Sequence, residues 1–105
     1  MATGRLAAAD LSAGTNTTVY ATPAAIYTVA SLNITNRGNQ PTVVSVAIAD
    51  LDTPTNGEYI EYETELSPKA ILERTGIVTS ATQKIVVTSN AANVSCVVFG
   101  IETAA

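Results

Sequence analysis

Two stretches of alternating apolar and polar residues dominate the middle of the sequence, and a cluster of turn-forming residues separates them. The first covers residues 26–36 and the second residues 42–49, with Arg-Gly-Asn-Gln-Pro between them. Alternation with a period of two is typical of a strand that buries one face. We therefore predict two successive antiparallel strands. Their register is well specified, because a slip of one residue would turn every buried side chain outward.

The first of these strands has two distinct predicted faces. The predicted inner face carries Ile26, Ala30, Leu32 and Ile34, and the outer face carries Tyr27, Ser31, Asn33 and Thr35. That outer face has no charge, so we expect it to suit contact with a neighbouring subunit. Pro41 makes the connection to the second strand long. The two strands therefore either pair directly or lie in different sheets.

Further strand-like segments recur at intervals of about 8–12 residues, with turn signals between them. They cover residues 16–21, 58–66, 70–78, 84–89 and 94–101. With the two central strands this makes about seven, which predicts a single antiparallel β-sandwich, Ig-like or jelly-roll-like. Gly76 indicates a bulge or bend in residues 70–78, and one helical turn over residues 68–73 is an alternative there. The last segment is apolar on both faces, which predicts a central strand or one covered by a partner chain.

The opening residues form an Ala-rich stretch with weak periodicity. A helical turn around residues 7–12 is one interpretation. We favour an extended arm over residues 1–14, followed by the β-sandwich domain over residues 15–105. Such an arm would reach a neighbouring molecule, with Arg5, Leu6 and Leu11 as its anchors.

Charge is scarce in this chain of 105 residues. Charged residues make up 13% of the sequence, the net charge is −4, and the five cationic residues are dispersed. This argues against nucleic-acid binding, which needs clustered cations to neutralise phosphates. No apolar run reaches the roughly 18 residues that a membrane helix needs. The first residues also lack the pattern of a signal peptide, so we expect synthesis in a cytoplasm. Much of the surface is neutral and small, which suits close packing against other subunits.

Residue types that support catalysis are largely missing. There is no His, and the single Cys96 lies in an apolar strand, which excludes the usual nucleophile–His systems and a zinc site. Six of the nine acidic residues fall between Asp50 and Glu65, with a spacing that partly resembles a calcium-binding EF-hand loop. Pro54 and Thr55 interrupt that pattern, so we interpret the acids as the solvated face of an exposed strand and leave calcium open. We predict no enzyme activity, no catalytic residue and no cofactor.

Three further side chains are candidates for contact. Tyr27 and Tyr59 are predicted to point away from the core, and shallow recognition sites use aromatic side chains with polar partners. Cross-strand packing on the sheet surface is the simpler interpretation of both. Arg74 lies beside Glu73 in an otherwise apolar run. It contacts another subunit, forms a local ion pair or surface turn with Glu73, or donates hydrogen bonds to loop carbonyls.

Short strings spread over nearly the whole chain carry a family resemblance. They are Met-Ala-Thr-Gly-Arg-Leu-Ala-Ala-Ala-Asp-Leu at residues 1–11, Thr-Thr-Val-Tyr at 17–20, Leu-Asn-Ile-Thr-Asn-Arg-Gly at 32–38, Glu-Tyr-Ile-Glu-Tyr at 58–62, Leu-Glu-Arg-Thr-Gly-Ile at 72–77 and Val-Val-Phe-Gly-Ile-Glu at 97–102. In these strings the chain resembles small structural proteins of tailed bacteriophages, especially marine and cyanobacterial ones. The resemblance supplies no catalytic residue.

The resemblance implies a β-sandwich virion component, such as a capsid decoration (cement) protein or a tail-associated assembly protein. Its partners would be other virion proteins and further copies of itself in a homo-oligomer. It would lie in the virion, and in the host cytoplasm during assembly. The alternative is a tail-tip or fibre module that recognises a glycan or protein on the host surface.

Overall fold

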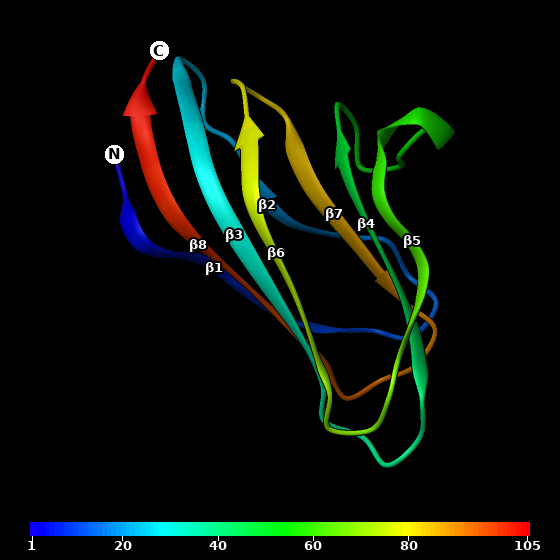
Figure 1. The fold of residues 1–105 in the computed structure, drawn as a ribbon. Helices are drawn as coiled ribbons and strands as arrows, with labels where there is room; N and C mark the ends of the chain where they lie inside the picture. Colours follow the sequence, from blue (N-terminus) through cyan, green and yellow to red (C-terminus); the bar gives the residue numbers. More distant parts are fainter.

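The computed structural model describes residues 1–105 and consists of two four-stranded antiparallel sheets packed face to face (Figure 1). The predicted β-sandwich is confirmed, with eight strands instead of about seven. The strands are β1 (Thr3–Leu11), β2 (Thr17–Ala21), β3 (Ile26–Asn36), β4 (Thr42–Ala49), β5 (Tyr59–Leu66), β6 (Ile71–Thr79), β7 (Lys84–Ser89) and β8 (Val94–Ala104). A single 3-10 turn, η1 (Asn56–Glu58), precedes β5.

The strand order is that of a jelly roll. One sheet has the order β1-β8-β3-β6 and the other the order β2-β7-β4-β5. Four antiparallel pairs are nested within one another, β4 with β5, β3 with β6, β2 with β7 and β1 with β8. Two further pairs, β3 with β8 and β4 with β7, complete the sheets. Of the two sandwich types expected from the sequence, the structure has the eight-stranded jelly roll.

The two central strands lie in different sheets, so the long connection at residues 37–41 crosses between the layers. Asn36 holds this crossing in place. Its buried amide nitrogen lies 2.8 to 3.3 Å from the carbonyl oxygens of Gln40, Leu66 and Ser67. Its side-chain oxygen accepts the backbone N–H of Gly38 at 2.9 Å. One side chain thereby ties the end of β3 to the crossing segment and to the end of β5.

The core lies between the sheets and is built from the side chains that each strand points inward. Ala30, Leu32 and Ile34 are buried, which confirms the predicted inner face of β3. The remaining large core side chains include Leu11, Val44, Val46, Ile85, Val87, Val94 and Val98. Burial of apolar surface of this kind is the main favourable term in folding.

The N-terminal residues form part of the sandwich instead of a separate arm. β1 pairs with β8 along its whole length, from Thr3 opposite Ile101 to Leu11 opposite Val94. The interpretation of residues 1–14 as an arm in front of the domain is therefore wrong, and so is the helical turn at residues 7–12. A bulge between Arg5 and Ala7 explains the weak periodicity, because the extra residue shifts the alternation halfway along the strand.

Other sequence expectations have a clear outcome. The turn at Ser67–Ala70 leads directly into β6, so residues 68–73 contain no helical turn. The bulge expected at Gly76 is confirmed, since the pairing of β6 with β3 shifts register there and Gly76 has a φ of +71°. β8 lies between β1 and β3, as expected of a strand that is apolar on both faces.

Candidate functional site

An apolar patch lies on the outer surface of the β1-β8-β3-β6 sheet, which we call the outer face. Its members are Tyr27, Val29, Val78, Phe99 and Ile101, which are between 39% and 62% exposed. Val78, Val29 and Ile101 are direct cross-strand neighbours in one row. Phe99 and Tyr27 lie two residues from Ile101 and Val29, on the same side of their strands. The patch is therefore contiguous, and contiguous exposed patches on single chains mark interaction sites.

The alternation of β8 produces this patch. Val94, Cys96 and Val98 point inward and are fully buried, whereas Phe99 and Ile101 point outward. β8 thus has the composition of a strand covered on both sides, while the chain itself covers only one side. A second layer of protein on the outer face would give β8 the surroundings that its sequence fits.

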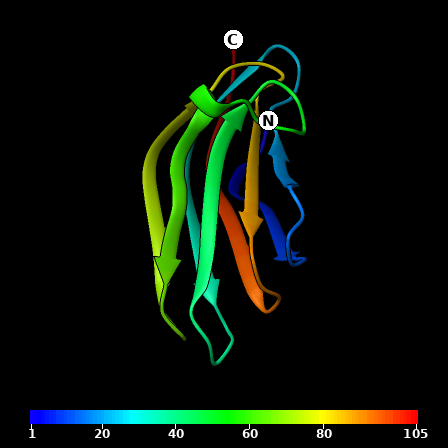
Figure 2. The same ribbon diagram turned by 90° about the vertical axis from the view of Figure 1, so that its right-hand side faces the viewer.

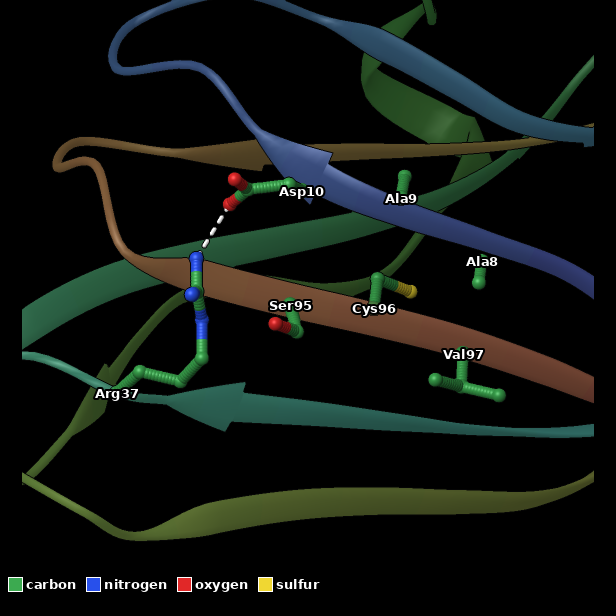
Figure 3. A pocket seen from close by; sticks show the side chains of 7 residues that line it. All are labelled: Ala8, Ala9, Asp10, Arg37, Ser95, Cys96 and Val97. Carbon is green, nitrogen blue, oxygen red and sulfur yellow. Dashed lines mark hydrogen bonds and ion pairs between the residues drawn. The ribbon is translucent and has the colours of Figure 1, made fainter.

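A shallow hollow of about 320 Å³ lies beside the patch, over β1 and β8 (Figure 3). Small side chains, including those of Ala8 and Ser95, line it together with Val97. Arg37 reaches from the end of β3 across β8, and its guanidinium donates to the carboxylate of Asp10 on β1 at 2.5 Å. Both side chains of this ion pair are largely exposed, so it adds little stability. The hollow has room for a small apolar group, with a charged pair at one end.

Two charged side chains at opposite edges of the outer face have no ionic partner. The ion pairs of the molecule join Arg37 to Asp10, Arg74 to Glu61 and Lys84 to Asp52. Arg5 on β1 and Glu73 on β6 take part in none of them, and both are exposed. The outer face therefore has an unpaired positive charge on one edge strand and an unpaired negative charge on the other.

The outer face brings together four of the contact residues expected from the sequence. Tyr27, Asn33 and Thr35 lie on it along β3, and Arg5 lies on its edge. Leu11, expected as an anchor for a neighbouring molecule, is instead 2% exposed in the core.

Leu6, expected as another anchor, is half-buried and packs against the core. Both leucines point inward because β1 buries one face in the sandwich and the bulge between Arg5 and Ala7 brings Leu6 to the same face as Leu11. Arg74 pairs with Glu61 across the open edge between β6 and β5, and not with Glu73. It therefore joins the two sheets.

The expected contact residue Tyr59 lies on the opposite sheet, in a second candidate site. Its ring packs against that of Tyr62 in an edge-on arrangement, with 4.9 Å between the ring centres. Simple alternation along β5 predicts these two residues on opposite faces, and that prediction is wrong. A bulge at Ile60, where the pairing of β5 with β4 shifts register between Tyr59 and Glu61, places both tyrosines on the outer side. A second bulge follows at Glu63, which has a φ of +50°, and its backbone N–H donates to the hydroxyl of Ser45 at 2.9 Å.

The tyrosine pair and Asn56 line a recess of about 450 Å³. Tyr62 is 63% exposed, so its ring is available to a ligand. The recess combines two aromatic rings with one amide, which is the composition of a shallow site for a polar ligand. The sequence does not reveal it, because the bulge that pairs the rings interrupts the period of two.

The acidic residues between Asp50 and Glu65 do not converge, and no group of three potential metal-binding side chains lies together. Asp52 accepts from the Thr18 hydroxyl at 2.6 Å and lies 3.3 Å from the Lys84 ammonium. Both contacts lower the pKa of Asp52, the Thr18 hydrogen bond most. They hold the loop between β4 and β5 across β7 toward β2 (Figure 2).

Cys96 is fully buried among core residues, and burial raises the pKa of its thiol to about 12. A thiol in this state is not nucleophilic near neutral pH. The expectation of a small buried apolar residue at this position is confirmed.

No protein-family model and no curated protein matches this chain. No helix of the structure is long and apolar enough to cross a membrane. The fold and its exposed surfaces define the chain as a jelly-roll sandwich with one uncovered apolar face.

Proposed function

We propose that the chain is a non-enzymatic structural protein of a virion, which acts through subunit–subunit contacts. Within the particle it serves as a capsid decoration (cement) protein or as a tail-associated assembly protein. The observation that carries the proposal is the contiguous apolar patch on the outer face, formed by residues such as Val78, Phe99 and Ile101. Apolar side chains arranged across three neighbouring strands suit a broad, flat contact with another protein.

Two further observations support a viral setting. Jelly-roll domains occur in viral capsid proteins, which is an analogy of fold and not of site. The short strings that resemble tailed-phage structural proteins lie partly on the outer face, in β1 and β8. The partners proposed are other virion proteins and further copies of the chain, without nucleic acid or membrane. The protein would reside in the virion, and in the host cytoplasm during assembly.

The test is to raise an antibody against the chain and probe density-purified particles of the phage that encodes it. We expect the chain in intact particles, at a constant ratio to the major capsid or tail protein. A variant with Ile101→Asp should remain folded and be lost from particles, because the charge would have to be desolvated in the contact. Glu65→Arg, on the other sheet, is the control and should be retained. Absence of the unmodified chain from particles, with the chain abundant in the lysate, would rule the proposal out.

A second candidate function is recognition of a host-surface glycan or protein by a tail-tip or fibre module. The recess at Asn56, Tyr59 and Tyr62 favours it, since jelly rolls also occur among lectins. A glycan array with the purified chain tests this function. Tyr62→Ala should abolish binding, whereas Tyr27→Ala removes an exposed tyrosine from the other sheet and should have no effect. Binding that survives Tyr62→Ala would exclude the recess as the site.

A further inference from the structure

We propose that the outer face binds a second copy of this chain, so that two β1-β8-β3-β6 sheets pack face to face in a two-fold symmetric dimer. The inference rests on the proposed function, because it names the partner in one of the subunit contacts. Four features of the outer face match one another under a single symmetry operation. The first is the apolar row, and the second is the large Phe99 beside the small Ser31. The third is the hollow over β1 and β8, and the fourth is the pair of unpaired charges on the two edge strands.

The symmetry operation is a two-fold axis that runs parallel to the strands, between β8 and β3. It reverses the lateral order β1-β8-β3-β6, so that β1 lies over β6 of the second copy and β8 lies over β3. Position along the strands is unchanged, so residues in one cross-strand row face the same row of the second copy. Packed sheets have strand directions within about 30° of each other, and a two-fold axis parallel to the strands keeps the strands of the two copies aligned.

The apolar residues then face one another. Val29 and Ile101 are neighbours in one row, and each lies opposite the other residue of the second copy. In the next row Phe99 is the neighbour of Ser31. Each Phe99 ring therefore lies over the small Ser31 of the second copy, which leaves room for the ring. Both contacts occur twice by symmetry, as an isologous interface requires.

The hollow has a matching side chain at the opposite edge of the same face. Ile71 on β6 is 54% exposed and belongs to the row of Thr35, Ser95 and Asp10. The symmetry operation places Ile71 of the second copy over the hollow at Ser95 and Asp10 (Figure 3). An exposed apolar side chain and a hollow lined by small residues thus occupy equivalent positions on the two edges.

The unpaired charges also match. Arg5 on β1 lies in the row of Phe99, and Glu73 on β6 lies in the next row, opposite Asn33. Under the two-fold axis, Arg5 faces Glu73 of the second copy at a displacement of two residues, roughly 7 Å along the strand. The long arginine side chain spans that displacement. The two charges complement each other only between two copies of the face, which favours a second copy over an unrelated partner.

The available area is sufficient for a modest dimer. Four strands about 4.8 Å apart, over about eight residues at 3.3 Å each, give a face of roughly 500 Å². Two such faces bury about 1,000 Å², which is near the lower limit for a specific interface. We therefore expect a dimer that dissociates on dilution.

Sedimentation velocity on the purified full chain, over a dilution series, measures the dimer directly. We expect a mass of twice 10.8 kDa at high concentration. Arg5→Glu and Glu73→Arg should each weaken the dimer about tenfold or more, because each places like charges together twice. The double variant should restore the dimer. Glu65→Arg, an exposed charge reversal on the other sheet, is the matched control and should leave it unchanged.

Circular dichroism of every variant checks that the fold is intact. A chain that stays monomeric at the highest concentration overturns the inference, and so does a double variant no better than the single ones. These results are distinct from a failure of the proposed function. A monomeric chain that is still found in particles retains that function without this dimer. A dimeric chain absent from particles retains the dimer without that function.

Discussion

The phenol of Tyr20 donates a hydrogen bond to the carboxylate of Glu102 at 2.5 Å and thereby joins β2 of one sheet to β8 of the other. The same phenol lies 2.8 Å from the buried hydroxyl of Thr28 on β3. Tyr20 is 7% exposed, so its hydroxyl depends on these two partners for its hydrogen bonds. This contact stands at the end of the sandwich where the two chain termini lie side by side (Figure 1).

Tyr20→Phe should destabilise the protein by about 1–3 kcal/mol, because it leaves the buried Thr28 hydroxyl without that partner. Urea unfolding followed by circular dichroism measures the change. Tyr27→Phe removes a phenol on the exposed outer face and should change the free energy of unfolding by less than about 0.5 kcal/mol. Equal effects of the two changes would show that the Tyr20 hydroxyl adds nothing.

Stability should fall in acid partly through Glu102. The hydrogen bond from Tyr20, followed by that from the Ala2 backbone N–H, lowers the pKa of Glu102 below its ordinary value of 4.5. A lowered pKa in the folded state adds stability above pH 4.5, and this stability is lost as the pH falls through the folded pKa. Glu102→Gln should therefore flatten the acid side of the curve of urea midpoint against pH. An unchanged slope would contradict this.

Stability should also fall at alkaline pH, through Tyr20. Burial, together with the hydrogen bond to Glu102, raises the pKa of Tyr20 above 10.0. The neutral phenol then adds stability that is complete below pH 10 and is lost as the pH rises toward the folded pKa. Absorbance titration of the phenolates should show a late component from Tyr20, above pH 10. Tyr20→Phe should remove that late component.

Gly100→Ala should be among the most damaging single changes. Gly100 packs against β3 so closely that an added Cβ would lie 2.1 Å from the carbonyl oxygen of Val29 and 2.7 Å from the Cα of Ala30. Both neighbours are backbone atoms of a central strand and cannot move aside locally. We expect a loss of more than about 3 kcal/mol, measured by thermal and urea unfolding. Gly57→Ala, where an added Cβ meets nothing within 4 Å, is the control.

Asn36→Asp should destabilise the protein more than Asn36→Ala. The amide of Asn36 donates toward three carbonyl oxygens, and a carboxylate there would meet the same oxygens with no hydrogen to donate. We expect about 2–4 kcal/mol for the alanine variant, from the lost bonds and the unsatisfied carbonyls. Asn39→Ala, at an exposed position of the same connection, should be nearly neutral. Asn36→Asp would be less destabilising than Asn36→Ala if the site held a bound cation.

Alternation explains how much of this fold the sequence predicts. Leu32 and Ile34 are buried where a period of two places them, and β8 is central because both of its faces are apolar. The same rule fails at bulges, where one extra residue reverses the faces. The bulge after Arg5 obscured β1, and the bulge at Ile60 moved Tyr62 next to Tyr59.

Pairing between distant strands was equally inaccessible from the sequence. Nothing in the sequence of β1 indicates that its partner is β8, because the alternation in a strand specifies which of its faces is buried and not which strand lies beside it. The outer face was therefore visible only in part, as the uncharged side of β3. Its apolar row across Val78, Val29 and Ile101 required the sheet order.

The nested strand pairing has a consequence for how the protein is made. β8, the last of the eight strands in chain order, is the partner of both β1 and β3, and β7 is the partner of both β2 and β4. Until β7 and β8 have been synthesised, β1 and β2 have no partner strand, and β3 and β4 each pair only with an edge strand. The two sheets can therefore be completed only after β8 has been synthesised, by slow long-range pairing. Loss of even the last dozen residues would remove the middle of one sheet and not merely its end.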